Sequence, residues 1–136
     1  MTTGRERSAG RLVAAGLFVV IANVQAAAQS PTIELRQGLV ITRSARIAPR
    51  AYRLPAPSSL DSSVITIRGD NITVDFAGAT MEGAAPEANP DAGAGIAIRI
   101  DGGRNIRSLN ARVRGCKIGI IARGTRGLTL IDNDLS

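Results

Sequence analysis

The feature that most constrains the fold is a regular spacing of aliphatic residues in the second half of the 136-residue chain. Ile106 and Leu128 each open a short strand after a turn, and they lie 22 positions apart. Ile72 precedes Ile106 by 34 positions, and the ten residues 84–93, which have loop composition, nearly account for the excess. A period of about 22 residues is typical of solenoids, in which each repeat stacks on the one before it.

Short apolar strands separated by turns make up each repeat. Residues 72–76 alternate strictly between an apolar and a polar face, and Ile98 and Ile120 repeat the 22-residue spacing. Because the chain has two Phe, one Tyr and no Trp, its core must consist of Ile, Val, Leu and Ala, which suits thin stacked sheets. The sequence therefore predicts an all-β solenoid of parallel strands over residues 64–136, with about two to three coils spaced about 4.8 Å apart.

The residues at 1–28 have the pattern of a secretory signal peptide. Arg5, Arg7 and Arg11 precede the apolar run 12–21 and form the positive n-region. Residues 26–28 fit the small-x-small rule, which predicts cleavage before Gln29. A retained membrane anchor is the alternative, but polar residues interrupt the apolar run, and a spanning helix needs about 20 apolar residues. We therefore expect a secreted or periplasmic protein without a membrane segment after cleavage. We expect residues 29–63 of this protein to form an irregular lead-in and cap.

The repeat pattern resembles that of a known family. One run resembles the opening coil of the right-handed parallel β-helix proteins of the pectate-lyase-like superfamily, and it reads ITIRGDNITVDFAGATMEG from Ile65 to Gly83. Residues 105–134 resemble the later coils of these proteins, and residues 46–54 resemble the lead-in strand and cap that precede them. The resemblance covers residues 64–136 and implies a right-handed parallel β-helix.

The resemblance implies a fold more firmly than an activity. The family includes pectate and alginate lyases, polygalacturonases, epimerases, periplasmic accessory proteins and adhesins. We therefore expect an exported protein that acts on or binds polysaccharide in its full form, with no catalytic site identifiable in this chain. The alternatives are a non-enzymatic, adhesin-like surface protein and a truncated remnant without function.

The repeats stop within a coil at Ser136, although solenoids need about three or more repeats and a cap at each end. The sequence therefore predicts an N-terminal fragment that lacks the central coils, where the family's active sites generally lie. An uncovered last coil also predicts self-association through its open edge.

Asp132 and Asp134 are the candidate catalytic residues. Two carboxylates at positions i and i+2 of a strand project from one face, and glycoside hydrolases of the family use clustered carboxylates for acid–base chemistry. The alternative, which we favour, is that these residues form a turn after Leu130 and Ile131, with Asn133 in a left-handed corner or an asparagine ladder.

Four other residues are candidates for substrate binding. Asp75 alternates away from the core, so it is a candidate for a sugar subsite or a solvated strand face. Arg99 and Arg107 occupy outward strand positions, and Arg104 lies in a turn beside them. The resemblance implies a possible role for them, because lyases of the family use Arg or Lys beside the uronate carboxylate; exposed arginines also solubilise a sheet.

Composition excludes several other functions. The chain has no His, and Glu87 and Asp91 of the insertion are too few for calcium, so we expect no metal or cofactor here, with calcium reserved for a longer form. Cys116 is expected to be a packed thiol. The net charge of +6, of which +4 remains after residues 1–28 are removed, is spread without aromatic residues between the arginines. This composition disfavours nucleic acid and permits an acidic polysaccharide as partner.

Overall fold

The computed structural model describes residues 30–84 and 93–136, and every regular element in these ranges is a β-strand. In chain order the strands are β1 (Thr32–Ile33), β2 (Leu39–Ile41), β3 (Ala45–Ile47), β4 (Ala51–Arg53), β5 (Ser63–Ile67), β6 (Ile72–Asp75), β7 (Thr80–Glu82), β8 (Ile96–Asp101), β9 (Arg104–Leu109), β10 (Arg112–Arg114), β11 (Ile118–Arg123) and β12 (Arg126–Ile131).

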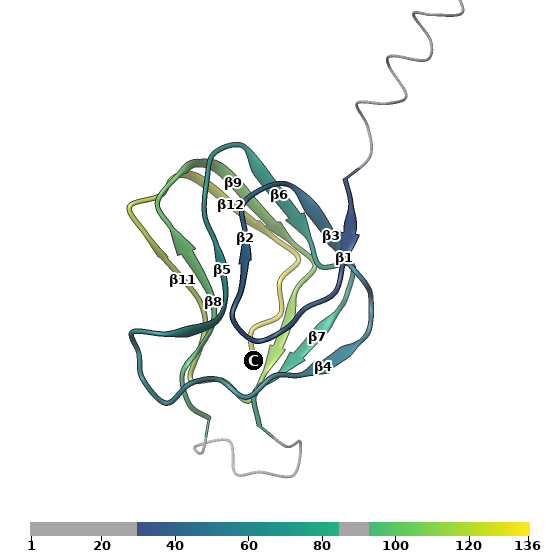
Figure 1. Ribbon diagram of the computed structural model, residues 1–136, viewed down its shortest axis with the longest axis vertical. Helices are drawn as coiled ribbons and strands as arrows, with labels where there is room; N and C mark the ends of the chain where they lie inside the picture. Colours follow the sequence, from purple (N-terminus) through teal and green to yellow (C-terminus); the bar gives the residue numbers. More distant parts are fainter. Residues whose placement is uncertain (1–29, 85–92) are drawn as a thin grey trace, which may run out of the picture. The chain divides into compact units, whose positions relative to one another are not determined.

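The strands form three parallel sheets (Figure 1). Sheet A has the order β1-β3-β6-β9-β12, sheet B the order β11-β8-β5-β2 and sheet C the order β10-β7-β4. From β2 onward the chain visits sheets B, A and C in turn and then returns to sheet B. Within the described ranges, these visits make three complete circuits, β2–β4, β5–β7 and β8–β10, followed by β11 and β12 of a fourth. This all-strand arrangement of stacked parallel sheets is compatible with a solenoid.

The register of the sheets confirms the predicted stacking of aliphatic residues. Ile72 pairs with Ile106, which pairs in turn with Leu128, so the three residues form one column across sheet A. In sheet B, Ile98 pairs with Ile120 on one side and with Ile65 on the other. Side chains in such columns lie about 4.8 Å apart, so each aliphatic group packs on the ones above and below it.

The structure also accounts for the predicted insertion 84–93. Glu82 pairs with Arg114, and Ile96 pairs with Ile118. Ile96 follows Glu82 by 14 positions, whereas Ile118 follows Arg114 by only four. The difference is ten residues, as the sequence predicts. The other two positions of the excess lie in the turn after β6, which is longer than the turn after β9.

The stacked strands begin nearer the N-terminus than the sequence indicates. Residues 39–53, which we expected in an irregular lead-in, form the first complete circuit, in which Leu39 pairs with Ile65 and Tyr52 pairs with Met81. The strands of this circuit have only three residues each, and Leu39 precedes its partner by 26 positions instead of 22. Short strands at an irregular spacing do not produce a detectable period.

Small aliphatic side chains fill the space between the three sheets. Phe76 is fully buried, and Tyr52 is 6% exposed. The remainder of the core is mainly Ile, Val and Ala, as the composition predicts. Burying an isoleucine fully contributes about 1.5–3 kcal/mol, so the columns are the main source of stability. Ser108 is also completely buried, in the column between Val74 and Leu130.

The turns between sheets B and A form a second repeated feature, here named the B–A corner. Asn71, Asn105 and Gly127 occupy successive circuits at this corner, each with positive φ, at 56°, 54° and 70°. Asn105 Nδ2 donates a hydrogen bond to Asn71 Oδ1 at 3.0 Å, which makes a short asparagine ladder. Asparagine tolerates the left-handed conformation because its side chain bonds locally.

The predicted signal peptide at 1–28 lies outside the described residues, as do Glu87 and Asp91. Within residues 30–84 and 93–136, we find no helix whose length and apolar character would let it cross a membrane.

The B–A corner generates a stability prediction that uses two adjacent glycines. Gly102 and Gly103 both have positive φ, but a Cβ atom at Gly102 would meet nothing within 4 Å, whereas one at Gly103 would collide with the Gly69 carbonyl oxygen. We expect Gly102→Ala to cost about 1–2 kcal/mol through backbone strain alone. Gly103→Ala adds a collision with the preceding circuit and should cost about 3 kcal/mol or more. Urea unfolding of the two variants measures both values, and equal losses would contradict the predicted contact.

Candidate functional site

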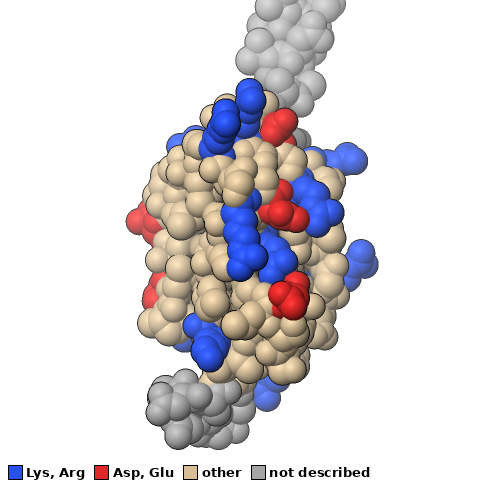
Figure 2. Space-filling model, turned by 90° about the vertical axis from the view of Figure 1, so that its left-hand side faces the viewer, with Lys and Arg blue, Asp and Glu red and all other residues tan. Residues whose placement is uncertain are grey.

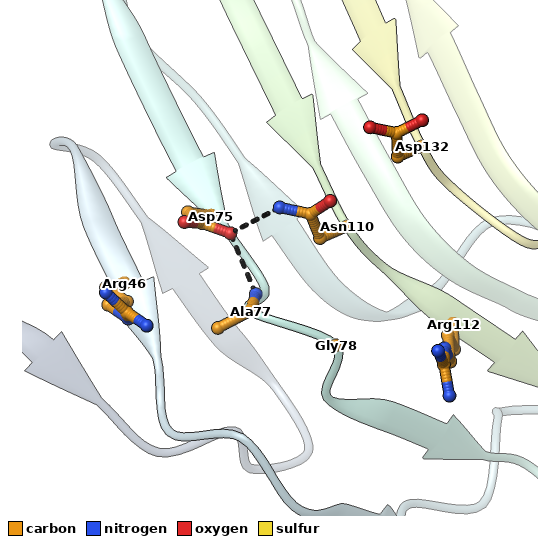
Figure 3. Close-up of a pocket in the computed structure, with 7 residues that line it drawn as sticks. All are labelled: Arg46, Asp75, Ala77, Gly78, Asn110, Arg112 and Asp132. Carbon is orange, nitrogen blue, oxygen red and sulfur yellow. Dashed lines mark hydrogen bonds between the residues drawn. The ribbon is translucent and has the colours of Figure 1, made fainter.

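An open groove of about 490 Å³ lies where sheet A turns into sheet C, a position here named the A–C corner (Figure 3). Polar side chains from four successive circuits meet in it. Its lining consists of Arg46, Asp75, Ala77, Gly78, Asn110, Arg112 and Asp132.

Strand alternation and strand pairing position the first two of these residues. Arg46 lies on β3 between Ala45 and Ile47, which are 3% and 0% exposed, so its own side chain points outward. It pairs in register with Asp75 at the end of β6. The guanidinium and the carboxylate therefore project from the same outer face of sheet A on neighbouring strands.

Asp75 is held in place by two hydrogen bonds. Its Oδ1 accepts one from the Ala77 backbone N–H at 2.8 Å and one from Asn110 Nδ2 at 3.1 Å. Ala77 and Asn110 both have positive φ, at 52° and 59°, because the chain turns sharply there towards sheet C. Asp75 thus supports the turns of two circuits, and Figure 3 shows Arg46 and Arg112 on opposite sides of the Asp75–Asn110 pair.

The two candidate catalytic aspartates do not converge on one site. Asp132 follows β12 in a left-handed turn with a φ of 54° and lines the groove. Asp134 Oδ2 instead accepts a hydrogen bond from Arg114 Nη2 at 2.8 Å. The favoured turn interpretation fits this geometry, although the left-handed residue is Asp132 instead of Asn133. Asn133 accepts from the Ala111 N–H and donates to the Ser108 carbonyl, at 3.0 and 2.9 Å.

The three candidate arginines lie outside the groove. Arg99 is on β8 of sheet B, where its Nη2 donates to the Leu60 carbonyl at 3.0 Å and its Nε is buried without a partner among the described residues. Arg107 is exposed on the outer face of sheet A, in register with Thr73. Arg104 is exposed at the B–A corner. The structure therefore brings Asp75 and Asp132 to one groove and leaves these arginines elsewhere.

Sequence reasoning missed the other three polar residues of the groove, Arg46, Asn110 and Arg112. The only available signal was the outward position of Arg46 between two aliphatic residues in the segment that we expected to be irregular. Asn110 and Arg112 lie in a two-residue turn and its exit, where polar residues are common and carry no pattern.

The groove has the chemistry of a polar recognition site. Two guanidiniums can donate paired hydrogen bonds to a carboxylate, the Asn110 amide can donate and accept, and the two carboxylates can accept from hydroxyl groups. Within the described part of the chain, no group of three or more His, Cys, Asp or Glu side chains could hold a metal ion. Cys116 lies away from the groove, and burial raises the pKa of its thiol.

Comparison of the chain with known protein families, with characterised proteins and with solved structures finds no match.

Asp134 generates a prediction of pH dependence. Hydrogen bonds from Arg114 and then Ser136 lower the pKa of its carboxyl from the ordinary 3.8 to about 2. Because the folded-state pKa lies below the unfolded one, the ionised carboxylate stabilises the fold above about pH 4, and this contribution is lost as the pH falls towards 2. We expect Asp134→Asn to lower the melting temperature at pH 7 and to match the wild type at pH 2.

Thermal unfolding followed by circular dichroism measures this difference across the pH range. Asp132→Asn is the matched control, because the Asp132 carboxylate accepts no hydrogen bond from the described residues. A melting-temperature difference for Asp134→Asn that stays constant from pH 7 to pH 2 would contradict the assignment.

Proposed function

We propose that this chain is an exported right-handed parallel β-helix of the pectate-lyase-like type that binds an acidic polysaccharide in the groove at the A–C corner. The fold part of the proposal is supported by the repeated B, A, C order of the sheets and by the aliphatic columns. Right-handedness is supported by the strong preference of crossover connections between parallel strands for that hand.

The groove lining carries the binding part of the proposal. Each acidic sugar presents one carboxylate and several hydroxyl groups, so it needs cationic donors and strong acceptors within one site. Arg46 and Arg112 supply the donors, and Asp75 and Asp132 supply the acceptors, with the Asn110 amide between them. This pairing of complementary groups is the single observation on which the proposal depends.

Charge balance favours a uronate polymer over a more highly charged polyanion. Two arginines and two aspartates line the groove, so their formal charges cancel. A phosphate polymer would meet two carboxylates and be repelled by both, whereas sugar hydroxyls donate to those carboxylates favourably. The groove therefore suits a ligand that carries one negative charge per unit and many hydroxyl groups.

The proposal is of binding rather than of catalysis. Asp75 already accepts two hydrogen bonds, and Asp134 is bonded to Arg114 outside the groove. A general acid–base pair needs two carboxyl groups that face one bond of the substrate, and Asp132 has no such companion among these residues.

Titration calorimetry with a short oligogalacturonate tests the binding proposal. We expect Arg46→Gln and Arg112→Gln each to weaken binding about tenfold or more, since a charge-assisted hydrogen bond contributes about 1.5–3 kcal/mol. A neutral oligosaccharide of equal length should bind at least tenfold more weakly than the oligogalacturonate.

The matched control is Arg36→Gln, which removes the same charge from an exposed residue before β2. Equal weakening by the control would indicate general attraction to the basic protein and would contradict the groove. Unchanged affinity in both groove variants would have the same meaning.

We also propose that the chain is exported by the signal peptide at 1–28 and released by cleavage before Gln29. The support comes from the apolar run and the three alanines before the cleavage position.

Expression of the whole chain in a bacterial host, followed by mass spectrometry of the released form, should give Gln29 as its first residue. Ala28→Gln should leave the precursor uncleaved, because that position needs a small side chain, whereas the control Ala27→Gln should be processed normally. Normal processing of both variants at the same bond would contradict the assigned site.

A further inference from the structure

Arginines gather at the B–A corner in the third and fourth circuits. Arg104, Arg123 and Arg126 are exposed at this corner, and Arg107 is exposed beside it on the outer face of sheet A. Figure 2 faces the side of the unit that carries β8 and β11, and basic side chains run down the middle of this face with acidic ones between them. This surface is separate from the groove, whose lining includes none of these four residues.

The pairing of two of these arginines is unusual. Arg104 at the start of β9 pairs directly with Arg126 at the start of β12. The Cα atoms of directly paired residues on neighbouring strands lie about 5 Å apart, so the two arginine side chains leave the sheet from adjacent positions. Like charges at directly paired positions destabilise a sheet, and a bound anion would relieve this repulsion.

No carboxylate of the described residues neutralises this pair. Asp70, which precedes Arg104 by one circuit, uses Oδ1 to accept from the Arg104 backbone N–H at 2.9 Å, and it forms no ion pair with the guanidinium. Asp101 is the other acid at this corner, and it is already bonded to Arg68 at 3.2 Å. The guanidiniums of Arg104 and Arg126 therefore have no acidic partner within residues 30–84 and 93–136.

Other charged columns of this structure alternate in sign. Asp101 pairs in register with Arg123 and is bonded on its other side to Arg68, so that column reads plus, minus, plus. On sheet C, Glu82 pairs in register with both Arg53 and Arg114. The column of Arg104 departs from this rule, because it has Asp70 on one side of Arg104 and a second arginine, Arg126, on the other.

We propose that Arg104 and Arg126 together bind a phosphomonoester group. A phosphomonoester carries close to two negative charges on one tetrahedral centre and offers three terminal oxygens. Two guanidinium forks carried on directly paired strand positions can each donate to different oxygens of that centre, which a planar carboxylate with one charge does not match. Arg107 and Arg123 lie three positions from Arg104 and Arg126, respectively, and add positive potential around the site.

Neighbouring contacts hold the turn of the fourth circuit against the third. Thr125 Oγ1 donates to the Gly102 carbonyl at 2.9 Å, and the Arg126 backbone N–H donates to the Gly103 carbonyl at 2.9 Å. These bonds fix the backbone that carries Arg126, so binding has to order only the side chains. A phosphomonoester can come from free phosphate or from a lipid headgroup, and the test separates these two sources.

The test measures binding of the whole chain to inorganic phosphate by calorimetry and to lipid vesicles by co-sedimentation. One set of vesicles contains phosphatidic acid, which presents a phosphomonoester, and the other contains phosphatidylglycerol, which presents a phosphodiester, at matched surface charge. We expect phosphate binding that Arg104→Gln and Arg126→Gln each weaken at least fivefold. Arg126→Lys should weaken it by a smaller factor, because lysine keeps the charge and loses the fork.

Two controls distinguish this site from general attraction and from the groove. Arg36→Gln removes one exposed charge elsewhere and should change phosphate affinity less than twofold. Arg46→Gln alters the groove and should also leave phosphate affinity within twofold, so the two proposals can fail independently.

The combined binding results identify the source of the phosphate and test the site. Binding to free phosphate and to phosphatidic acid vesicles, with loss in both corner variants, supports a headgroup ligand. Binding to free phosphate alone, with the same loss, supports the site with a soluble ligand. Equal binding to both kinds of vesicle, equal loss in Arg36→Gln, or no phosphate binding at all would overturn the proposal.

Discussion

Backbone hydrogen bonding between parallel strands of successive circuits is the constraint on which the rest of this structure depends. It sets a step of about 4.8 Å between circuits and holds equivalent residues in register, so each residue type is stacked on its counterpart. An aliphatic position then becomes a continuous column, as for Ile72, Ile106 and Leu128. The same register stacks asparagines into a ladder, as Asn105 and Asn71 show. It also stacks charged residues into columns, in which opposite signs on neighbouring strands are favourable and like signs are not.

Each surface site in such a structure combines side chains from several successive circuits. The groove at the A–C corner takes Arg46 from the first circuit, Asp75 from the second, Asn110 and Arg112 from the third and Asp132 from the fourth turn. No single circuit contains a recognisable site, and Arg46 and Asp132 are 86 positions apart in the sequence. The turns also determine which polar groups remain available: Asp75 is engaged by a backbone amide and by Asn110, and Asn133 bonds to the main chain of the preceding circuit.

Charge has different effects at the two corners. At the A–C corner, two arginines and two aspartates balance, which suits a ligand with both hydroxyl groups and a carboxylate. At the B–A corner, Arg104 and Arg126 are paired without an acid, which suits a compact dianion. Both surfaces rest on the same scaffold of aliphatic columns, so the ligand preference depends on the outward residues alone.

The sequence by itself determined the strand content, the 22-residue period, the pairing of Ile98 with Ile120 and the ten-residue insertion, because a periodic apolar pattern is a local property of the chain. It did not reveal the first circuit, since the three-residue strands over 39–53 are offset by 26 and then 29 positions from their partners. Only the tertiary structure decided which polar residues meet at the A–C corner. Arg46 and Asp75 are 29 positions apart, because the turns of the first circuit differ in length from those of the later ones, so the 22-residue period could not place them side by side. Arg104 and Arg126 are 22 positions apart, so the period stacks them, but only the structure shows that they form no ion pair within the described residues.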